Sequence, residues 1–284
     1  MKFATFEHGG REQVGWVEAD RVHPIDTADM LDLIARYDAV RSGLSEQRRG
    51  IALGDVHLLA PIPRPRRNIF CVGKNYRDHA HEFARSGYEA GATKGAEIDD
   101  YPAVFTKPGS CVVGPGATVQ LHPSVTSAVD YEGELAVVIG RQGRDINRAE
   151  AIGYVWGYTI VIDVTARDRQ KKHRQWFLGK ALDTFCPMGP WITTADEVTA
   201  DDLQLQTRVN GEVRQNANTR DLIFDIPSLI ETLSAGMMLQ PGDVIATGTP
   251  AGVGLGLDPP RFLGPGDEVT VTITGLGTLH SPFA

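Results

Sequence analysis

The sequence predicts a mainly β fold of the α+β class, with one large domain and a small N-terminal domain. Several short runs rich in β-branched residues follow residue 65, and they do not alternate regularly with helical segments. This pattern argues against a doubly wound parallel sheet, in which a helix follows each strand. The chain has 284 residues, of which 42% are hydrophobic, so a large buried core is expected.

The small N-terminal domain is expected to span residues 1–62. Two short strands around a glycine turn would precede a helix over residues 27–40. The apolar residues of that helix lie three or four positions apart, at Met30, Leu33, Ile34 and Tyr37. Residues 60–68 are rich in proline and arginine, which is typical of a linker, so the large domain is predicted over residues 66–284.

Three local patterns predict elements of the large domain. Asn210-Gly211 between two strand-like runs predicts a hairpin with a type I′ turn. Thr165 and Asp168 have the spacing of a capping box and predict the start of a helix. Residues 226–234 predict another helix, whose apolar residues form one stripe at Ile226, Leu229, Ile230 and Leu233.

Composition limits the functions to consider. Lys and Arg number 28 against 36 Asp and Glu, and the formal net charge of −8 argues against nucleic acid or an anionic membrane as partner. The three cysteines are widely spaced and form no CxxC pair, so neither a disulfide framework nor a zinc cluster is predicted. No signal-peptide core and no apolar span of membrane length occurs, so we expect a cytoplasmic protein.

Three carboxylates are the first candidates for a functional site. In residues 130–140, DYEGELAVVIG, Glu132 and Glu134 lead into an apolar strand and share one face, and Asp130 is expected to join them. A second apolar strand ends at Asp163. Glu132, Glu134 and Asp163 could hold one divalent cation, and all-oxygen ligands suit Mg²⁺, Mn²⁺ or Ca²⁺ rather than zinc. The alternative is that these acids are solvated strand ends or pair with arginines.

The stretch NYRDHAHEF, residues 75–83, offers a candidate general base. His79 and Glu82 are three residues apart, so on a helical turn the carboxylate can hold the imidazole. On a strand, His79 and His81 could instead be metal ligands, and a polar surface turn is the third reading. Residues 84–102, rich in glycine and alanine, are too long for an ordinary turn and predict a lid or mobile loop.

A lysine and a glycine-rich run complete the candidates. Lys180 lies in an apolar, glycine-flanked segment and could bind an anion or oxyanion, although a lone lysine is usually a surface residue. Gly252, Gly254 and Gly256 follow a strand, but LDPPRF comes next rather than a helix, so the dinucleotide-binding fingerprint fails.

Taken together, these motifs resemble the fumarylacetoacetate hydrolase family. The matching segments occur in the family's order from about residue 66 to the C-terminus: CVGKNYRDHAHE, DYEGELAVVIG, VIDVTARDRQ, GKALDTFCPMGPW, VNGEVRQ and PGDVIATGTPAGVG. The resemblance implies a mixed β-sandwich roll, usually a homodimer, with one Mg²⁺ or Mn²⁺ per subunit, for which Ca²⁺ can substitute in crystals.

The resemblance also implies roles for single residues. It assigns metal ligation to the three carboxylates Glu132, Glu134 and Asp163, and water activation to a His79–Glu82 dyad. It implies substrate contacts for Lys180, Gln170, Thr249, Tyr76 and Arg77. The longer fumarylacetoacetases place a fourth acidic ligand where this chain has Asn75, so the shorter bacterial subgroup is implied, with open positions on the metal.

The shared chemistry of this family proceeds through a metal-stabilised enolate. The first expectation is hydrolysis of the C–C bond of a 2,4-dioxo acid, a small anionic keto acid of the acylpyruvate type, in the catabolism of aromatic compounds or sugar acids. A decarboxylase of oxaloacetate-like 2-oxo acids and a keto–enol isomerase are alternatives on the same site. A β-rich binding module with a structural ion is the non-enzymatic alternative.

Overall fold

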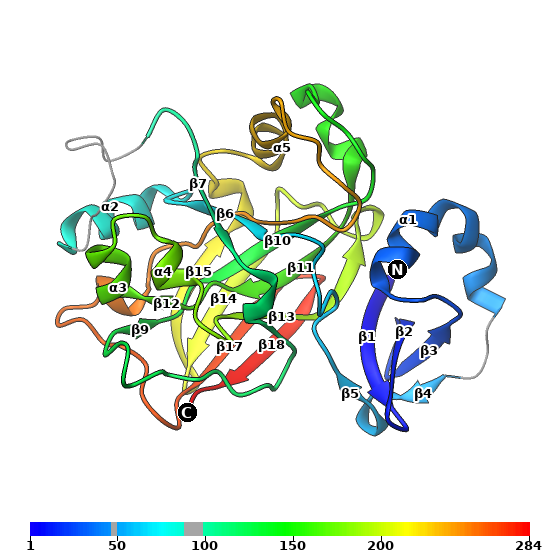
Figure 1. Ribbon diagram of the computed structural model, residues 1–284, viewed down its shortest axis with the longest axis horizontal. Coiled ribbons are helices and arrows are strands. Elements are labelled where there is room, and N and C mark those ends of the chain that lie inside the picture. Colours follow the sequence, from blue (N-terminus) through cyan, green and yellow to red (C-terminus); the bar gives the residue numbers. More distant parts are fainter. Residues whose placement is uncertain (47–49, 88–98) are drawn as a thin grey trace.

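The structure is a computed structural model that describes residues 1–46, 50–87 and 99–284. Strands outnumber helices, and they form a large mixed sheet, a four-stranded antiparallel sheet and a short two-stranded pair (Figure 1). The mainly β class that the sequence predicted, with a mixed sheet, is therefore confirmed.

The large sheet contains twelve strands. They are β1 (Lys2–His8), β2 (Arg11–Glu18), β3 (Arg21–Ile25), β4 (Ile51–Ala52), β5 (His57–Leu58), β6 (Ile69–Gly73), β7 (Ala103–Lys107), β8 (Val112–Val113), β10 (Gly133–Ile139), β11 (Val155–Ile162), β13 (Cys186–Thr194) and β16 (Val244–Ala246). Their order is β4-β3-β2-β1-β13-β11-β10-β16-β6-β7, with β5 paired to β1 and β8 paired to β13.

The second sheet has the order β15-β14-β17-β18 and packs on one face of the large sheet. Its strands are β14 (Gln204–Val209), β15 (Glu212–Asn218), β17 (Glu268–Ile273) and β18 (Gly277–Pro282). β10 is buried along its whole length, and its alternate residues enter two different cores. Leu135, Val137 and Ile139 pack with the four-stranded sheet, whereas Ala136 and Val138 pack on the opposite side.

The opposite core joins the N-terminal part of the chain to the rest. β1 pairs with β13 in antiparallel register, so that Phe3 lies beside Ile192 and the sheet continues from the N-terminal strands into the large domain. The predicted linker, residues 60–68, contains no helix and no strand until Ile69. The division at residues 62 and 66 stays a prediction, since the two parts share one sheet.

The described residues contain five α-helices: α1 (Met30–Val40), α2 (Arg77–Arg85), α3 (Arg167–Lys172), α4 (Phe177–Lys180) and α5 (Ile226–Ser234). In Figure 1, α2, α3 and α4 gather at the side of the sheet away from the N-terminal strands. The predicted helices over 27–40 and 226–234 are confirmed as α1 and α5, and each begins after an aspartate that accepts a backbone N–H.

The local turn predictions have different outcomes. Asn210 and Gly211 both have positive φ, at 50° and 80°, and join β14 to β15, as the hairpin prediction requires. The capping box at Thr165 is wrong, because this residue is extended in β12 (Thr165–Ala166), which pairs with β9 (Val129–Asp130). The helix therefore begins two residues later, at Arg167.

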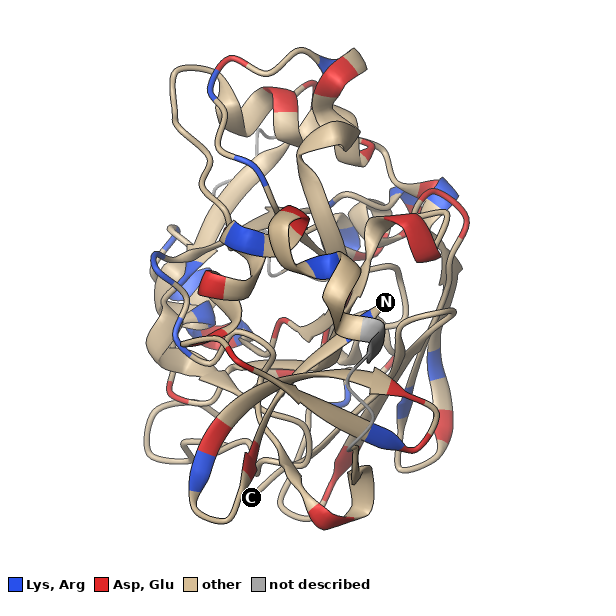
Figure 2. Cartoon of the chain, turned by 90° about the vertical axis from the view of Figure 1, so that its right-hand side faces the viewer, with Lys and Arg blue, Asp and Glu red and all other residues tan. Residues whose placement is uncertain are grey.

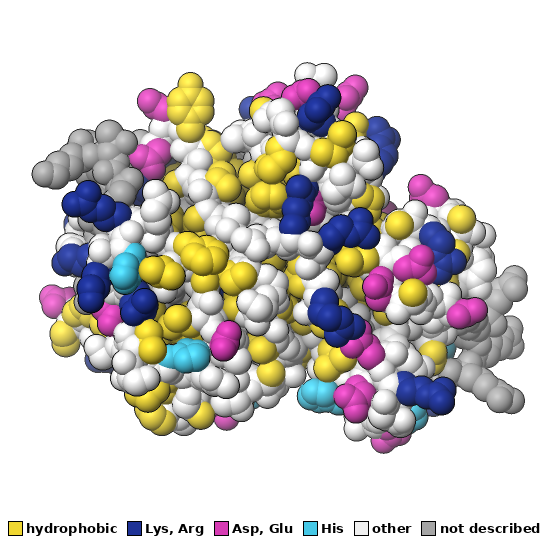
Figure 3. Space-filling view, viewed as in Figure 1, with side chains coloured by type: hydrophobic (Ala, Val, Ile, Leu, Met, Phe, Trp, Pro, Cys, Tyr) yellow, Lys and Arg dark blue, Asp and Glu magenta, His cyan; other side chains and the backbone are white. Residues whose placement is uncertain are grey.

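Charged residues of both signs are interspersed over the side of the molecule drawn in Figure 2. Figure 3 shows apolar side chains gathered near the middle of one face, with charged side chains around them. No helix in the described part of the chain is long and apolar enough to cross a membrane.

The junction of the N-terminal strands with β13 should contribute strongly to stability. Phe3 is fully buried, and its ring centroid lies 5.3 Å from that of Trp156 and 5.6 Å from that of Tyr37. We expect Phe3→Ala to lower the free energy of unfolding by about 3–5 kcal/mol, since it leaves a cavity between the two parts. Urea denaturation measures this, with Tyr101→Ala, at an 80% exposed position, as the control that should cost little. A loss below 1 kcal/mol for Phe3→Ala would contradict the expectation.

Candidate active site

Two adjacent strands bring three acids together at one end of the large sheet. In the antiparallel register of β10 and β11, Glu134 lies opposite Val161, and beyond the end of this pairing the backbone N–H of Asp163 donates to the carbonyl of Glu132. Glu132, Glu134 and Asp163 are all buried, and each offers a carboxylate oxygen within 4.8 Å of the others. The structure thus brings the three predicted metal ligands into one group.

Two buried lysines hold Asp163 in place. Lys180 Nζ lies 2.7 Å from Asp163 Oδ2, and Lys107 Nζ lies 2.7 Å from Asp163 Oδ1. Lys107 also donates to the carbonyl oxygens of Val164 and Lys180, at 3.0 and 2.5 Å. Burial alone would lower the pKa of Lys107, but the adjacent Asp163 raises it above the ordinary value, so this lysine is charged.

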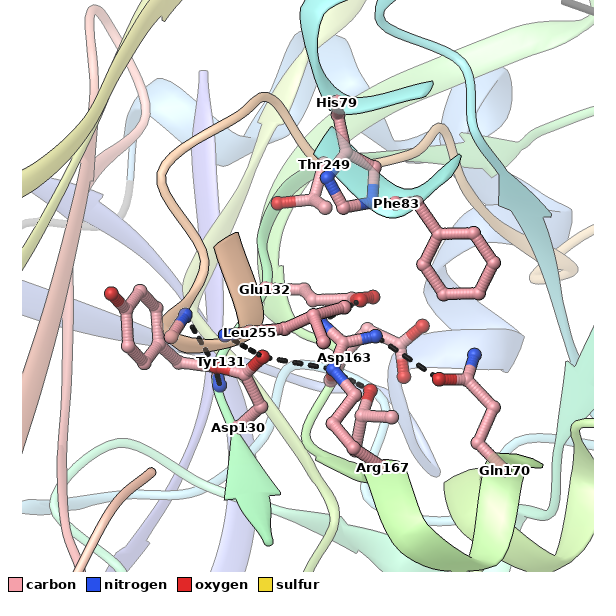
Figure 4. A network of polar contacts seen from close by, with 12 residues as sticks. His79, Phe83, Asp130, Tyr131, Glu132, Asp163, Arg167, Gln170, Thr249 and Leu255 are labelled. Atoms are coloured by element: carbon pink, nitrogen blue, oxygen red, sulfur yellow. Dashed lines mark hydrogen bonds and ion pairs between the residues drawn. The ribbon is translucent and has the colours of Figure 1, made fainter. Parts of the chain in front are cut away.

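Arg167 is the largest fully buried side chain and balances two other acids. Its Nε lies 2.8 Å from Asp130 Oδ2 and its Nη2 lies 2.7 Å from Glu132 Oε1. Burial would raise the pKa of Glu132, but the charges of Lys180 and Arg167 lower it below its usual range. In Figure 4, Arg167 and Gln170 lie on one side of the Glu132 carboxylate, and His79 and Thr249 lie on the other.

Asp130 does not join the three acids as expected. It lies in β9 and accepts backbone N–H groups of Gly254 and Leu255, at 2.7 and 3.0 Å, in addition to Arg167 (Figure 4). These contacts explain the glycine-rich run that had no assigned role, because a Cβ at Gly254 would lie 2.7 Å from Asp130 Oδ1 and 2.0 Å from the carbonyl oxygen of Arg261.

Glu134 is the acid that lacks a cation among the described residues. Its carboxylate accepts a hydrogen bond from the backbone N–H of Gly248, at 2.9 Å. Burial raises the pKa of Glu134 well above its ordinary value, and the negative charges of Asp163 and Glu132 raise it further. A divalent cation bound to the three carboxylates would supply the missing positive charge, and its preference for oxygen ligands fits this donor set. The residues present therefore fit a divalent metal ion.

The candidate base is formed on α2, beside this group. His79 Nδ1 lies 2.9 Å from Glu82 Oε2, and Glu82 Oε1 accepts the backbone N–H of Gly252 at 3.0 Å. A Cβ at Gly256 would lie 1.8 Å from Glu82 Oε1, so any residue other than glycine at this position would clash with the carboxylate. The reading of His79 and His81 as a pair of metal ligands on a strand is wrong, because the segment is helical and residues two apart face different sides.

A small cavity of about 20 Å³, with room for little more than a water molecule, lies beside the three acids and the His79–Glu82 pair. His79, Glu132, Glu134, Lys180, Gln170 and Thr249 all line it, and Phe83, Phe105 and Trp176 form its apolar wall. A keto acid bound beside a metal ion needs more space, so side chains at the rim must move when it enters.

Two residues predicted to contact substrate lie elsewhere. Tyr76 and Arg77 are not among the residues that line this cavity; they face a separate hollow of about 510 Å³ beside Arg220 and Asp221. Asn75, at the position of the fourth acidic ligand in longer relatives, is fully buried. The side-chain amide of Asn75 forms hydrogen bonds with the backbone of Phe224 and Thr247. Residues 88–98 of the predicted lid lie outside the described residues.

Sequence reasoning missed two buried cations of the site, Lys107 and Arg167. A signal for Arg167 existed, since a row of acids at a strand end demands a positive partner and this arginine lies four residues after Asp163. For Lys107, which ends β7, the sequence offers only a lysine between a threonine and a proline.

The fold and the site define a mainly β protein with one carboxylate-built site for a divalent cation. The chain belongs to the fumarylacetoacetate hydrolase family, because the family model "Fumarylacetoacetate (FAA) hydrolase C-terminal" matches residues 68–284. A second model, "Rv2993c-like, N-terminal", matches residues 1–61. Members of the family are enzymes, among them hydrolases, isomerases and a tautomerase.

Three relatives illustrate the range of reactions. The oxaloacetate tautomerase YisK of Bacillus subtilis is 53% identical over 231 residues, which are 81% of this chain and 74% of that protein. The fumarylacetoacetate hydrolase of Exiguobacterium antarcticum has a TM-score of 0.84 at 41% identity, covering 100% of this chain and 99% of that one. Maleylpyruvate hydrolase from Sphingobium sp. SYK-6, solved with manganese(II) and pyruvate, has a TM-score of 0.81 at 34% identity, with 100% and 99% covered.

The two glutamates should respond differently to removal of their charge. We expect both Glu134→Gln and Glu132→Gln to weaken Mn²⁺ binding at least about 100-fold, because each removes a ligand. Glu134→Gln should leave the stability of the metal-free protein unchanged or higher, since no cation loses its partner. Glu132→Gln removes the carboxylate that pairs with Lys180 and Arg167, so it should lower the free energy of unfolding by about 3–5 kcal/mol. Calorimetry and urea denaturation measure the two quantities; equal stability losses would contradict this assignment.

Metal binding should also release a proton from Glu134. Between the ordinary carboxyl pKa of 4.5 and the raised pKa of Glu134, the metal-free protein holds a proton on this carboxyl. A metal ion must displace that proton, so Mn²⁺ affinity should rise with pH across this window. Calorimetric titrations in buffers of different ionisation enthalpy count the released protons. A binding enthalpy that is the same in every buffer would show that Glu134 is already ionised.

Proposed function

We propose that this protein is a divalent-metal-dependent enzyme that interconverts the keto and enol forms of oxaloacetate or a closely related 2-oxo acid. The observation that carries this proposal is that Glu132 and Glu134 of the carboxylate triad, His79 of the His–Glu pair and the buried Lys180 line one small cavity, with Asp163 and Glu82 directly behind them. Tautomerisation needs only that a proton is moved between a carbon and an oxygen, and a small cavity that excludes bulk water suits such a step. The name of the Bacillus subtilis relative supports the choice of oxaloacetate.

In this proposal, each residue of the site has a separate chemical role. Glu132, Glu134 and Asp163 would hold the divalent ion, which would supply a Lewis acid for the 2-oxo group of the substrate. His79 uses its Nε2 to take the proton from C3, because its Nδ1 is held by Glu82. Lys180 faces the same cavity and stabilises the negative charge on the enolate oxygen. Gln170 and Thr249 line the cavity and position the substrate.

Hydrolysis of an acylpyruvate, the first expectation from the sequence, is the second candidate. The same His79–Glu82 pair can take a proton from water instead of from carbon. The manganese and pyruvate complex of maleylpyruvate hydrolase supports it, because that protein shares this fold and is named for hydrolysis. Decarboxylation of oxaloacetate would need the same enolate stabilisation but no base to expel CO₂. The choice between Mg²⁺ and Mn²⁺, a homodimer and a cytoplasmic location stay predictions.

The proposal is tested by following oxaloacetate tautomerisation by the ultraviolet absorbance of the enol. We expect His79→Ala to lower kcat by on the order of 10²–10⁴, the usual contribution of a general base. His81→Ala is the matched control on the same helix and should stay within about threefold, since His81 does not line the cavity. A chelator should abolish turnover and leave the protein folded, whereas a purely structural ion would take the fold with it.

The result also separates the candidates. If an acylpyruvate is cleaved with a higher kcat/KM than oxaloacetate is tautomerised, hydrolysis is the main activity and the first proposal is wrong. If His79→Ala and His81→Ala lose activity equally, the assignment of His79 as the base must be withdrawn.

A further inference from the structure

We infer that Lys74 binds a second carboxylate of the substrate, so that the site selects 2-oxo diacids over 2-oxo acids with an uncharged end. This inference rests on the proposed function, which it deepens by naming the substrate class. Lys74 directly follows β6 and lines the same cavity as His79, Glu132, Glu134 and Lys180. Although it is a lysine, only 8% of it is exposed.

The direction of Lys74 is fixed by the backbone on both sides. Its φ is +54°, in the left-handed region that lysine rarely adopts, so the surrounding structure must hold it there. The next residue, Asn75, is tied by its side chain to the backbone of Phe224 and Thr247. The preceding residue, Gly73, packs so closely that a Cβ would lie 2.2 Å from the Trp176 ring. A strained backbone that points a lysine into the cavity is typical of a functional site.

Lys74 differs from the other cations of the cavity in its partners. Lys180 pairs with Glu132 and Asp163, and Arg167 pairs with Asp130 and Glu132, so both already balance acids of the site. The ammonium of Lys74 makes no hydrogen bond of good geometry among the described residues. Its counter-charge there is Asp99, whose Oδ2 lies 2.6 Å from Lys74 Nζ. Among the described residues, Lys74 is therefore the lysine or arginine of the cavity whose ion pair involves none of the three metal-site carboxylates.

Asp99 can be exchanged for a substrate carboxylate. Its side chain is 23% exposed, against 6% for that of Lys74, so it can turn into solvent at little cost. A carboxylate at the far end of a bound 2-oxo acid would carry the same charge and take the same place. An uncharged end could not, and Lys74 would then keep Asp99 or lie buried without a counter-charge. The pairing thus favours diacids because their second carboxylate supplies a counter-charge for Lys74. The size of the far end is not the basis of the selection.

The test compares two four-carbon acids that differ only at the far end. Oxaloacetate carries a carboxylate where 2-oxobutanoate carries a methyl group, and both exchange C3 protons with D₂O through an enol. The readout is the ratio of their kcat/KM values for this exchange, with Mn²⁺ saturating. We expect Lys74→Met, which keeps the chain length but removes the charge, to lower the ratio at least tenfold, mainly by raising KM for oxaloacetate. Lys74→Arg should retain most of the preference.

Binding of oxalate is the control for the metal end of the site. Both carboxylates of oxalate can bind the metal ion, so neither is needed at Lys74. Its affinity for the Mn²⁺-loaded protein should change less than twofold in Lys74→Met. Asp99→Asn, which removes the competing carboxylate and leaves the cavity intact, should lower KM for oxaloacetate a few-fold. Asp100→Asn, at the exposed neighbouring position, should not change it.

The possible failures can be told apart. If Lys74→Met slows both acids by the same factor, or weakens oxalate binding as much as it weakens oxaloacetate, the inference is overturned and Lys74 has a general electrostatic or structural role. If the wild-type protein binds oxalate but exchanges neither acid faster than Mn²⁺ alone, the proposed function is overturned, and the inference is overturned with it.

Discussion

The burial of Asp163 between two lysines is the interaction on which the site depends. Lys107 comes from the end of β7, Lys180 from α4 and Asp163 from the end of β11, so one carboxylate fixes three elements that are distant in the sequence. Removal of Asp163 would leave Lys107 buried without the carboxylate that compensates its charge, which is costly. The same lysines hold the Asp163 carboxylate beside two glutamates, at the end of a sheet whose strands are otherwise largely apolar.

The sequence predicted those parts of the site that follow from strand periodicity. Glu132 and Glu134 share a face because they are two residues apart, and the end of the next strand brings Asp163 beside them. It could not predict Lys107 or the contacts of Asp130, since these arise from pairing between distant segments. The capping box failed for a related reason: Thr165 has the right spacing, but pairing with Asp130 keeps it extended. The resemblance implied substrate contacts for Tyr76 and Arg77, but these two residues line a separate hollow at the start of α2 and not the small cavity.

The relatives show that one framework serves several reactions. A tautomerase, a hydrolase of maleylpyruvate and a fumarylacetoacetate hydrolase share this fold or sequence. The inner part of the cavity, with its acids and their buried cations, provides what these reactions have in common. Their differences must arise at the rim, where the substrate's far end lies and where water is admitted or excluded. The rim is also the part for which sequence patterns give the least information, because loops and single side chains form it.

The pairing of β1 with β13 has a consequence for how the chain can be divided. The part of β13 around Ile192 and Thr193 lies inside the large sheet because β1 pairs with it through Phe3 and Lys2. Without the first 61 residues, this part of β13 would become an exposed strand edge next to an uncovered apolar surface around Trp156. Such an edge is a template for pairing with another molecule, so the isolated large domain would tend to aggregate. The N-terminal part therefore protects the solubility of the domain that carries the chemistry, although it contributes no side chain to the cavity within the described residues.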